Sequence, residues 1–563
     1  MSTTMRPVWL AGRGLSCPLG ASLAESLARL TQPALRTLVD CGDLGTLPLF
    51  SLSNNTAQDA EQWHLQTRVQ IRQVAAEAGL TNKPDAPLFI ASSSINIGAL
   101  ELGSRWQRDS AFAELEELAK ALDWQGPLYW INTACTSALN AVLAARSLIA
   151  NGLHDDVMVL GLELPNRFTT RGFAAMQLLS PTRPQPLGAA RDGLVLGEAI
   201  AALHLSSAPA RWQIGPGAHI VDGADSTGAS VDAIVRCWQD ALGTPVESVD
   251  LIKLQASGSP MNDQKEVDAV TRLGLKPTPE LTSLKALLGH SLGASGAAEL
   301  ALLSACLEAG TCSAPDYPLD TTLPLTLTTA PAASVRRALL SIIGFGGSHA
   351  AVRLEDADVT TPSPPIPTRT YKVIGRQTDA QSADWQNELY TMLGSRPRRL
   401  GSWVELGLWG ALRCMRQAGV PEPGDDLIIR ISSLDGPRQA IEKALSESLD
   451  SGTPMPFSFL QSQPSQLLAR LAAALHWQGD ARIVTQRDPI ALIRLALCEQ
   501  ATCGGDILLG WLDEATPTLP ARSQWLFLRS DAAALTSEAP AGIDGDVMLA
   551  HAFRLDEGVL RWW

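Results

Sequence analysis

The chain has 563 residues, 45% of them hydrophobic and 18% charged, and its formal net charge is −14 at pH 7. This length predicts two or more domains with sizeable buried cores. The acidic balance and the absence of a long Lys/Arg run exclude a surface that neutralises nucleic-acid phosphates.

Targeting and metal-binding signals are also missing from the sequence. The nine cysteines are scattered and form no CxxC pair, which argues against a disulfide framework and a structural zinc site. The apolar run at the N-terminus is short and interrupted by glycine, and no stretch reaches the length of an uncharged transmembrane helix. The histidines show no ligand spacing. We therefore expect a cytoplasmic protein with no membrane span and no metal.

Strand-like and helix-like stretches alternate along the first part of the chain. Short apolar runs at 7–12, 86–92 and 128–133 predict strands, and the last of these leads into an Ala/Leu-rich helix. Residues 157–163 carry no polar side chain before their last position, which is typical of a buried strand. This alternation predicts βαβ units in a largely parallel sheet that helices cover on both faces.

A proline-rich segment at 356–369 divides the chain, because clustered proline favours an extended linker and disrupts helices. The part after it echoes the part before it. Residues 130–163 are predicted as strand, turn, helix and strand, and residues 482–514 repeat that order. Matching the two copies places Arg487 opposite Cys135, so the second copy lacks the thiol. Any two βαβ units share some of this order, so the echo also fits unrelated units.

Cys135 lies at the predicted turn between the strand and the helix. The helix dipole and the free N–H groups at this place are expected to lower the pKa of the thiol and to stabilise an oxyanion. A thiolate attacks thioesters readily, so the position suits an acyl acceptor. Taken alone, a cysteine is more often a small buried residue.

Motifs elsewhere in the chain favour the catalytic interpretation. Five stretches, in a fixed order, resemble the β-ketoacyl-[acyl-carrier-protein] synthases of the thiolase superfamily. They are TACTSALNA at 133–141, GFAAM at 172–176, RDGLVLGE at 191–198, KALLGHSLGASGAAE at 285–299 and GFGG at 344–347.

This resemblance implies a role for each matching residue. Cys135 would take the acyl chain as a thioester, and His290 would bind the malonyl thioester and help to stabilise its enolate. The backbone N–H groups of Cys135 and Phe345 would form the oxyanion hole. Lys285 and Glu299 would hold and polarise the surroundings of His290, although a purely structural ion pair accounts for them equally well.

Ser295 is a conservative exchange within the motif at 285–299, and two further departures from the family pattern concern the family's histidine at position 255 and its asparagine at position 349. The segment 255–266 aligns with HGTxTxxxDxxE, but Gln255 stands in place of the histidine. Glutamine donates a hydrogen bond without carrying positive charge, and losing one donor from such a site costs roughly 10²–10³ in rate. His349 stands where the family has asparagine, and we interpret it as a structural residue with local contacts. Gly346 and Gly347 are expected to adopt conformations that a Cβ would block.

The resemblance implies an α/β fold with a thiolase-like αβαβα layered core at 1–355, in halves of about 1–225 and 226–355. The module at 370–563 is similar to half of a thiolase fold without a nucleophile, of the kind that accompanies aryl-polyene synthases. The implied enzyme is an acyltransferase of the 3-oxoacyl synthase type. It would condense the acyl chain on Cys135 with malonyl-acyl carrier protein in fatty-acid, polyketide or aryl-polyene biosynthesis.

The alternative is a non-elongating subunit, either like a chain-length factor or acyl-transferring, that pairs with an active ketosynthase. Gln255 favours this alternative, whereas Cys135, Lys285 and His290 favour the enzyme. In both cases the expected partners are acyl carrier protein and, as a homodimer or heterodimer, another ketosynthase chain. No cofactor is expected, because the substrates arrive on the phosphopantetheine of the carrier.

Overall fold

The computed structural model describes most of the chain. The described ranges are 4–52, 57–79, 83–103, 110–223, 228–312, 314–328, 335–359, 370–378, 384–397, 399–501, 504–516 and 520–531. The predicted linker falls largely on residues 360–369, which lie outside these ranges.

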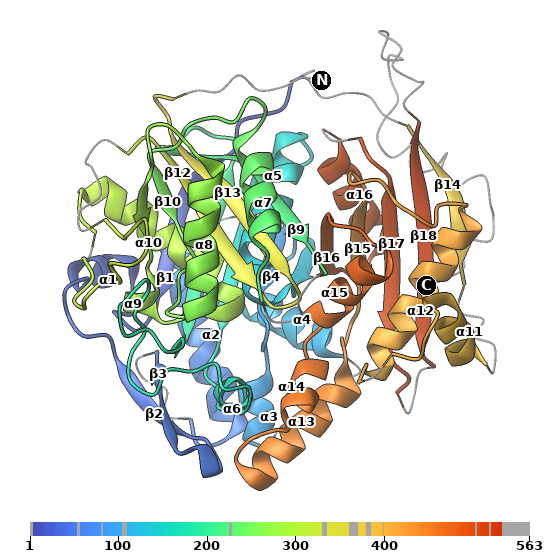
Figure 1. Ribbon diagram of the computed structural model, residues 1–563, viewed down its shortest axis with the longest axis horizontal. Coiled ribbons are helices and arrows are strands. Elements are labelled where there is room, and N and C mark those ends of the chain that lie inside the picture. Colours follow the sequence, from blue (N-terminus) through green and yellow to red (C-terminus); the bar gives the residue numbers. More distant parts are fainter. Residues whose placement is uncertain are drawn as a thin grey trace.

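A 15-stranded sheet runs through the molecule and divides into three sets of five strands (Figure 1). Each set has the same spatial order: its third, second, fourth, fifth and first strand along the chain. The third, second and fourth strands are parallel, and the fifth pairs antiparallel with its two neighbours. The sheet is therefore mixed, whereas we expected a largely parallel one.

The three sets follow one another along the chain. The first is β1 (Trp9–Ser16), β4 (Leu88–Ala91), β5 (Leu128–Ile131), β6 (Asp156–Glu163) and β8 (Ala199–Ser206). The second is β9 (Trp212–Val221), β10 (Leu251–Lys253), β11 (Glu280–Thr282), β12 (Arg337–Gly344) and β13 (Ser348–Asp356). The third is β14 (Thr370–Gln377), β15 (Ile428–Ser432), β16 (Asp480–Thr485), β17 (Ile507–Asp513) and β18 (Arg522–Asp531).

The second set begins earlier than the boundary near residue 225 that we predicted. β9 pairs with β13 along most of its length and with β1 at a single position, so it belongs to the second set. The two halves of the N-terminal domain therefore meet between Ser206 and Trp212. The apolar pattern of β9 fits either half, and only its pairing decides.

The first two sets form the predicted αβαβα core, with two buried helices between them. α5 (Ser137–Ala150) and α10 (Ser295–Ala309) contact each other and strands of both sets. Gly296 allows this close approach, since a Cβ there would lie 2.6 Å from the backbone nitrogen of Leu139. α2 (Ala60–Glu77) packs on β1 and β8, and α7 (Val231–Leu242) packs on β9 and β13.

Capping residues define several of these helices. The side chains of Asp59 and Ser230 accept backbone N–H groups at the starts of α2 and α7. The remaining helices are α1 (Leu23–Ala28), α3 (Ile97–Glu101), α4 (Ala111–Ala121), α6 (Phe168–Ala175), α8 (Pro260–Leu273), α9 (Lys285–Leu288), α11 (Trp385–Leu393), α12 (Ser402–Gln417), α13 (Arg438–Ser451), α14 (Pro456–Gln461), α15 (Ser465–Ala474) and α16 (Pro489–Gln500). A small separate sheet holds β2 (Arg36–Asp40), β3 (Thr46–Phe50) and β7 (Leu196–Gly197).

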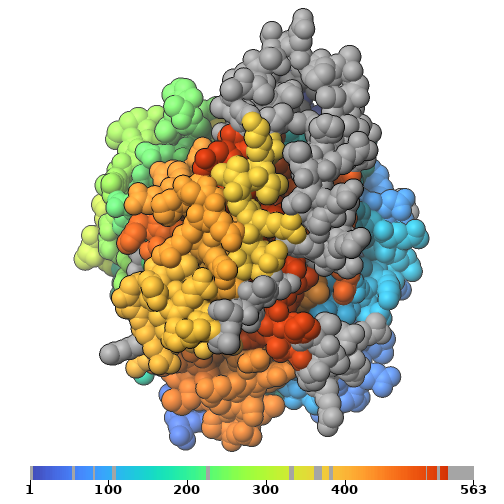
Figure 2. Space-filling model, turned by 90° about the vertical axis from the view of Figure 1, so that its right-hand side faces the viewer, coloured from blue at the N-terminus to red at the C-terminus, as the bar shows by residue number. Residues whose placement is uncertain are grey.

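The third set belongs to the C-terminal module, which continues the sheet of the N-terminal domain. β16 pairs antiparallel with β5, and α16 packs against α5. The strand order is therefore mirrored across this junction, from β1-β8-β6-β4-β5 to β16-β15-β17-β18-β14. Figure 2 shows the module in yellow to red, with green and blue parts of the N-terminal domain on either side of it. The edge of β5 is thus occupied by the same chain.

One segment of the described residues, Leu292–Ala309, is long and apolar enough to cross a membrane, and 83% of it is buried inside the protein. It contains α10, the central core helix, whose Glu299 is paired with buried lysines. Its burial accounts for its apolar character as a helix of the protein interior.

Candidate active site

Cys135 lies in the 3₁₀ turn Ala134–Thr136, between β5 and α5, as the sequence predicted. Ser137 secures this turn by accepting the N–H of Thr133 at 2.9 Å and donating to the carbonyl of Ala134 at 2.6 Å. Ala134 has a φ of 53°, a left-handed conformation that is uncommon for a residue with a Cβ. The nucleophile candidate therefore lies on a tightly held turn.

A cavity of about 30 Å³ opens at the thiol. Its lining combines side chains of both modules: Ser93, Ser94, Ile97, Ala134, Cys135, Phe168, Thr169, Phe173, Leu292, Phe345, Ile441, Phe459, Ser462 and Gln463. A larger surface pocket of about 390 Å³, lined by Arg211, Cys312 and Arg336 among others, contains none of the predicted site residues. The small cavity is therefore the candidate active site, because Cys135 and Phe345 line it.

Burial raises the pKa of the Cys135 thiol to about 11. The charge of Lys285 and the backbone N–H groups of Phe345 and Cys135 act in the opposite direction. We expected the start of the helix to lower this pKa. The local donors do so, but the loss of water around the buried sulfur outweighs them.

His290 lies against Lys285 and Gln255, two of the predicted site residues. Lys285 Nζ is 3.2 Å from Nδ1, which also accepts the backbone N–H of Leu292 at 3.2 Å. Burial, followed by the charges of Lys285 and Lys253, lowers the pKa of His290 well below its usual value. The imidazole is therefore neutral and carries a single proton.

The amide nitrogen of Gln255 lies 3.1 Å from Nε2 of His290 and donates to the carbonyl of Ile343 at 3.1 Å. Its Oε1 is buried and has no hydrogen-bond partner among the described residues. Glu266 accepts the backbone N–H of Gln255 at 2.7 Å, which holds this loop in place. Gln255 and His290 are thus neighbours at the site.

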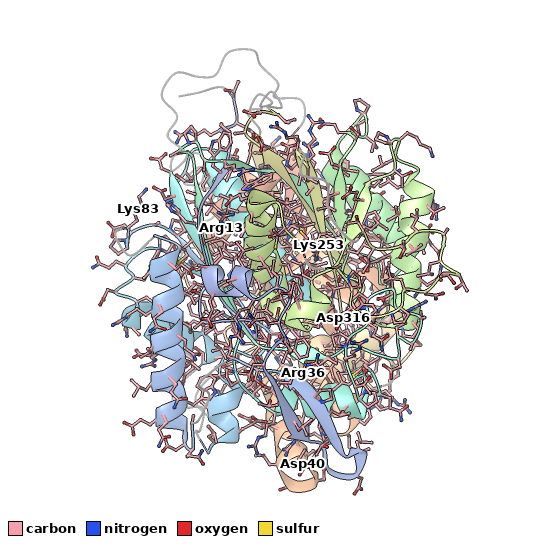
Figure 3. All side chains as sticks on the ribbon, turned by 90° about the vertical axis from the view of Figure 1, so that its left-hand side faces the viewer. Arg13, Arg36, Asp40, Lys83, Lys253 and Asp316 are labelled. Carbon is pink, nitrogen blue, oxygen red and sulfur yellow. The ribbon has the colours of Figure 1, made fainter. Side chains whose placement is uncertain are left out.

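Glu299 compensates two buried lysines at once, since both Lys285 and Lys253 pair with it. Figure 3 places Lys253 in the packed interior, whereas Lys83 reaches the edge of the domain. Lys285 also donates to Ser295 Oγ at 2.9 Å. Burial lowers the pKa of Lys253, an effect that the charge of Glu299 opposes and that of Lys285 reinforces.

The loop 344–347 brings Phe345 to the thiol. Gly346 and Gly347 have φ values of 82° and 62°, which glycine adopts without strain. A Cβ at Gly346 would lie 2.6 Å from the carbonyl of Ser465 in the C-terminal module, so that module limits this position as well. The turn with Cys135 also contacts the turn Leu292–Ala294 that follows His290. The fold thus gathers all the predicted site residues in one region.

Comparison with known proteins identifies the family. Residues 117–210 match the description "Beta-ketoacyl synthase, N-terminal domain", and residues 212–315 match "Beta-ketoacyl synthase, C-terminal domain". A putative polyketide beta-ketoacyl synthase 1 of Streptomyces halstedii is 30% identical over 302 residues, covering 45% of this chain and 69% of that protein. The chain belongs to the β-ketoacyl synthase family.

Other family members match over shorter shares of their length. Nodulation protein E of Rhizobium sp. (strain N33) is 28% identical over 260 residues, which cover 42% of this chain and 63% of that protein. The actinorhodin polyketide putative beta-ketoacyl synthase 1 of Streptomyces coelicolor is 30% identical, with 43% of this chain and 57% of that protein covered. The chain therefore spans less than two thirds of these relatives.

Solved structures of β-ketoacyl synthases share the fold. The structure titled "Ketosynthase (ApeO) in Complex with its Chain Length Factor (ApeC) from Xenorhabdus doucetiae" aligns with a TM-score of 0.54 at 22% identity, over 62% of this chain and 98% of that one. "PfaC Keto synthase-Chain length factor" aligns with a TM-score of 0.73 at 14% identity, over 95% of this chain and 79% of that one. The second alignment includes the C-terminal module.

Sequence reasoning missed several residues of this β-ketoacyl synthase site. Glu163 accepts hydrogen bonds from Ser93 and Ser94, and burial raises its pKa to about 7. We had interpreted the serines only as a small-residue turn. Lys253 and Phe459 lie outside the five motifs of the N-terminal domain, and Phe459 comes from the C-terminal module. Only the position of Glu163, at the end of a buried strand, signalled a constrained polar group.

His349 has a structural environment, consistent with its interpretation from the sequence. Its Nε2 lies 3.2 Å from the carboxylate of Asp222, and both side chains are buried. The contact is with a carboxylate rather than with the local backbone groups that we expected. His349 is not among the residues that line the cavity with Cys135.

Proposed function

We propose that this protein accepts an acyl chain on Cys135 and condenses it with a malonyl thioester to give a 3-oxoacyl thioester. The observation that carries the proposal is the cavity in which the Cys135 thiol meets the Phe345 N–H, beside the His290–Lys285 pair. A thiol, two backbone donors and a neutral imidazole in a buried site are the groups that acyl transfer through an oxyanion requires.

In the first step, Cys135 Sγ attacks the acyl thioester of a carrier protein. The Sγ–acyl bond forms, the bond to the phosphopantetheine sulfur breaks, and the carrier thiol leaves with the proton that Cys135 loses. The backbone N–H groups of Cys135 and Phe345 would stabilise the oxyanion between these events. The thioester arm brings all the chemistry that a cofactor would supply, so we propose that the enzyme has none of its own.

In the second step, the malonyl thioester loses CO₂ and becomes an enolate. A proton on Nε2 of His290 would be donated to the enolate oxygen, and the charge of Lys285 beside this ring would favour the enolate. The enolate carbon then attacks the acyl group, and Cys135 leaves as a thiolate that regains a proton. In sum, an acyl thioester, a malonyl thioester and a proton give a 3-oxoacyl thioester, CO₂ and a free carrier thiol.

Gln255 supports a second candidate, a subunit that binds or transfers acyl chains without elongating them. Its amide provides a donor next to His290 but no positive charge. A subunit of this kind would assemble with an active ketosynthase. Such a partner would have to bind away from the β5 edge, because β16 covers that edge. Carrier-protein binding, pairing with another ketosynthase and a cytoplasmic location remain proposals for both candidates.

The test uses the purified full chain with an acyl-carrier protein and a malonyl-carrier protein. Mass spectrometry measures the acyl adduct on Cys135, and a coupled assay measures CO₂. We expect the adduct to disappear in Cys135→Ala and CO₂ release to fall in His290→Ala. Cys237→Ala serves as the matched control, since this buried thiol lies on α7.

The two candidates predict different results. Acylation of Cys135 together with CO₂ release and a 3-oxoacyl product supports the condensing enzyme. Acylation without CO₂ release supports the non-elongating subunit. A wild-type chain that takes no acyl group on Cys135 contradicts both.

A further inference from the structure

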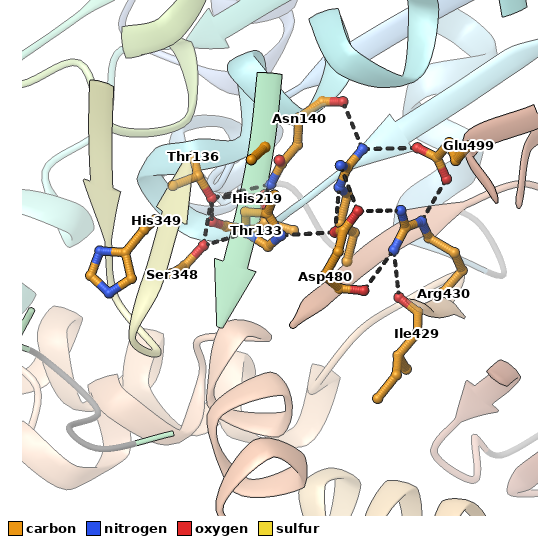
Figure 4. A network of polar contacts seen from close by, with 12 residues as sticks. Thr133, Thr136, Asn140, His219, Ser348, His349, Ile429, Arg430, Asp480 and Glu499 are labelled. Carbon is orange, nitrogen blue, oxygen red and sulfur yellow. Dashed lines mark hydrogen bonds and ion pairs between the residues drawn. The ribbon is translucent and has the colours of Figure 1, made fainter. Parts of the chain in front are cut away.

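A chain of hydrogen bonds connects the C-terminal module with the turn that carries Cys135 (Figure 4). The hydroxyl of Thr136 lies 2.8 Å from Ser348 Oγ. Ser348 Oγ lies 2.8 Å from Nε2 of His219, and Nδ1 of His219 lies 3.0 Å from Asp480 Oδ1. These contacts join residue 136 to residue 480 without a gap.

In the C-terminal module, these hydrogen bonds end at Asp480. Arg430 and Arg482 each donate to its Oδ2 at 2.7 Å, and both arginines also bind Glu499. Although burial opposes ionisation, the charges of these arginines hold the pKa of Asp480 far below its usual range. Asp480 is therefore a fixed carboxylate that only accepts hydrogen bonds.

The state of Asp480 determines the directions of the hydrogen bonds at His219. Burial lowers the pKa of His219 to about 4, so the imidazole is neutral at pH 7. Its single proton lies on Nδ1 and is donated to Asp480, which leaves Nε2 to accept the hydroxyl of Ser348. The Ser348 oxygen keeps its lone pairs for Thr136, whose single hydroxyl hydrogen is also within reach of the Thr133 carbonyl at 2.8 Å.

Ser348, His219 and Asp480 have the order of groups found in a Ser–His–Asp hydrolase triad. However, Ser348 is only 1% exposed, and its hydroxyl is already engaged by Thr136 and His219. A substrate has no path to this oxygen. The arrangement therefore acts on the structure around it rather than as a nucleophile.

The bond between Thr136 and Ser348 ties together the two segments whose N–H groups face the thiol. Thr136 follows Cys135 in the turn, and Ser348 follows the loop that carries Phe345. These backbones touch, since a Cβ at Gly344 would lie 3.3 Å from the backbone nitrogen of Cys135. The spacing of the two N–H donors therefore depends on how Thr136 and Ser348 are held.

We propose that Asp480 is a positioning residue: through His219, Ser348 and Thr136 it holds the two oxyanion-hole donors of the other module at the thiol. The inference rests on the proposed acyl transfer and deepens it. It assigns the C-terminal module a part in the reaction, because removing the Asp480 carboxylate loosens the backbone N–H donors of Cys135 and Phe345. Neither Asp480 nor His219 touches the reacting atoms.

The first test compares two reactions of the same thiol in the full chain. Transfer of an acyl group to Cys135 passes through an oxyanion, whereas alkylation by iodoacetamide does not. In Ser348→Ala we expect the rate constant for acylation to fall roughly tenfold at unchanged KM, and alkylation to stay within about twofold of wild type. The control is Ser304→Ala, which removes a buried hydroxyl that donates to Leu300 within α10.

The second test links this effect to the C-terminal module. Asp480→Asn should reproduce the loss of acylation, and the double variant with Ser348→Ala should lose no more than either single variant. If Asp480→Asn fails to fold, His219→Leu takes its place, because an apolar side chain removes both hydrogen bonds of His219 and leaves the arginine pairs of Asp480 intact.

Amide hydrogen exchange provides a readout that needs no acyl transfer. Exchange in peptides covering 133–137 and 344–349 should rise several-fold in Ser348→Ala and in the Asp480 or His219 variant, and stay unchanged in Ser304→Ala. Equal losses of acylation and alkylation, or no loss of acylation, overturn the inference. If wild-type Cys135 takes no acyl group, the proposed function fails. In that case, unchanged amide exchange in the Ser348, Asp480 and His219 variants overturns this inference as well. Raised exchange in those variants supports the hydrogen-bonded link.

Discussion

Single residues set the electrostatics of the site, and Glu299 is the central one. It pairs with both Lys253 and Lys285, and all three side chains are buried. Glutamate at this position accepts hydrogen bonds from both lysines and keeps Lys285 beside His290, where its charge would attract the negative charge of a malonyl group or an enolate. Removing Glu299 would leave two buried lysines without their carboxylate, at a cost of about 3–5 kcal/mol.

The pKa of Cys135 leads to a prediction about its reactivity. Because burial raises this pKa to about 11, the group is a neutral thiol at pH 7, and its thiolate fraction grows with pH. We expect the rate of Cys135 alkylation by iodoacetamide to rise about tenfold per pH unit between pH 7 and pH 10. Peptide mapping follows the modified residue, with Cys135→Ala to assign it. A rate that levels off near pH 8 would contradict the effect of burial.

Gln255→His restores the histidine of the family pattern and tests its effect on the rate. The glutamine amide already lies 3.1 Å from Nε2 of His290, so an imidazole at this position would stand beside the first one. We expect release of CO₂ from malonyl-carrier protein to rise by roughly 10²–10³. Gln264→His, a less buried position on α8, is the control. An unchanged rate would show that residue 255 does not take the place of the family's histidine.

At the scale of elements, two helices from different modules close the cavity at Cys135. Phe459 on α14 packs against Phe168 and Phe173 on α6, with ring centroids 5.6 and 5.7 Å apart, and Phe173 stacks on Phe345. Gly172 leaves room for this contact, since a Cβ there would lie 2.1 Å from the ring of Phe459. About 30 Å³ holds little more than two water molecules, so a longer acyl chain must displace these rings.

Phe459→Leu therefore changes which acyl chains fit. We expect the rate of Cys135 acylation by a long acyl-carrier thioester, relative to an acetyl one, to rise about threefold or more, because a smaller side chain enlarges the cavity. Phe457→Leu, at an exposed position of the same helix, is the matched control. The same ratio of rates in both variants would mean that α14 does not limit the cavity.

At the scale of the whole molecule, the junction between β5 and β16 joins the two modules. Val484 and Thr485 pair with Ile131 and Trp130, and α16 packs on α5. The C-terminal module thereby covers a buried, apolar strand that would otherwise form an exposed sheet edge. Unpaired edge strands of this kind associate with other chains.

A shortened chain, residues 1–359, tests this role. Its β5 edge is uncovered, so we expect it to associate through this edge. At the same concentration it should form larger assemblies than the full chain. Light scattering measures the mass, with the full chain at the same concentration as the control. A shortened chain that stays monomeric and folded would show that the module is not needed to cover the edge.

Much of the fold follows from local patterns in the sequence. Buried strands such as 157–163 and the turn at Cys135 lie where their apolar runs predicted them. The direction of the strands and the boundary at Trp212 did not follow, because an apolar strand carries no mark of its partner. The repeat of 130–163 at 482–514 was visible as an order of elements, but the mirrored junction of β5 with β16 was not.

The sequence alone determined the nucleophile candidate, the motif residues around His290 and the departure at Gln255, because each depends on residue type and spacing along the chain. The tertiary structure decided that Phe459 reaches the cavity, that Asp480 is connected to Thr136, and that burial outweighs the helix start at the Cys135 thiol. These properties arise from contacts between residues hundreds of positions apart and from the exclusion of water, and a linear sequence records neither.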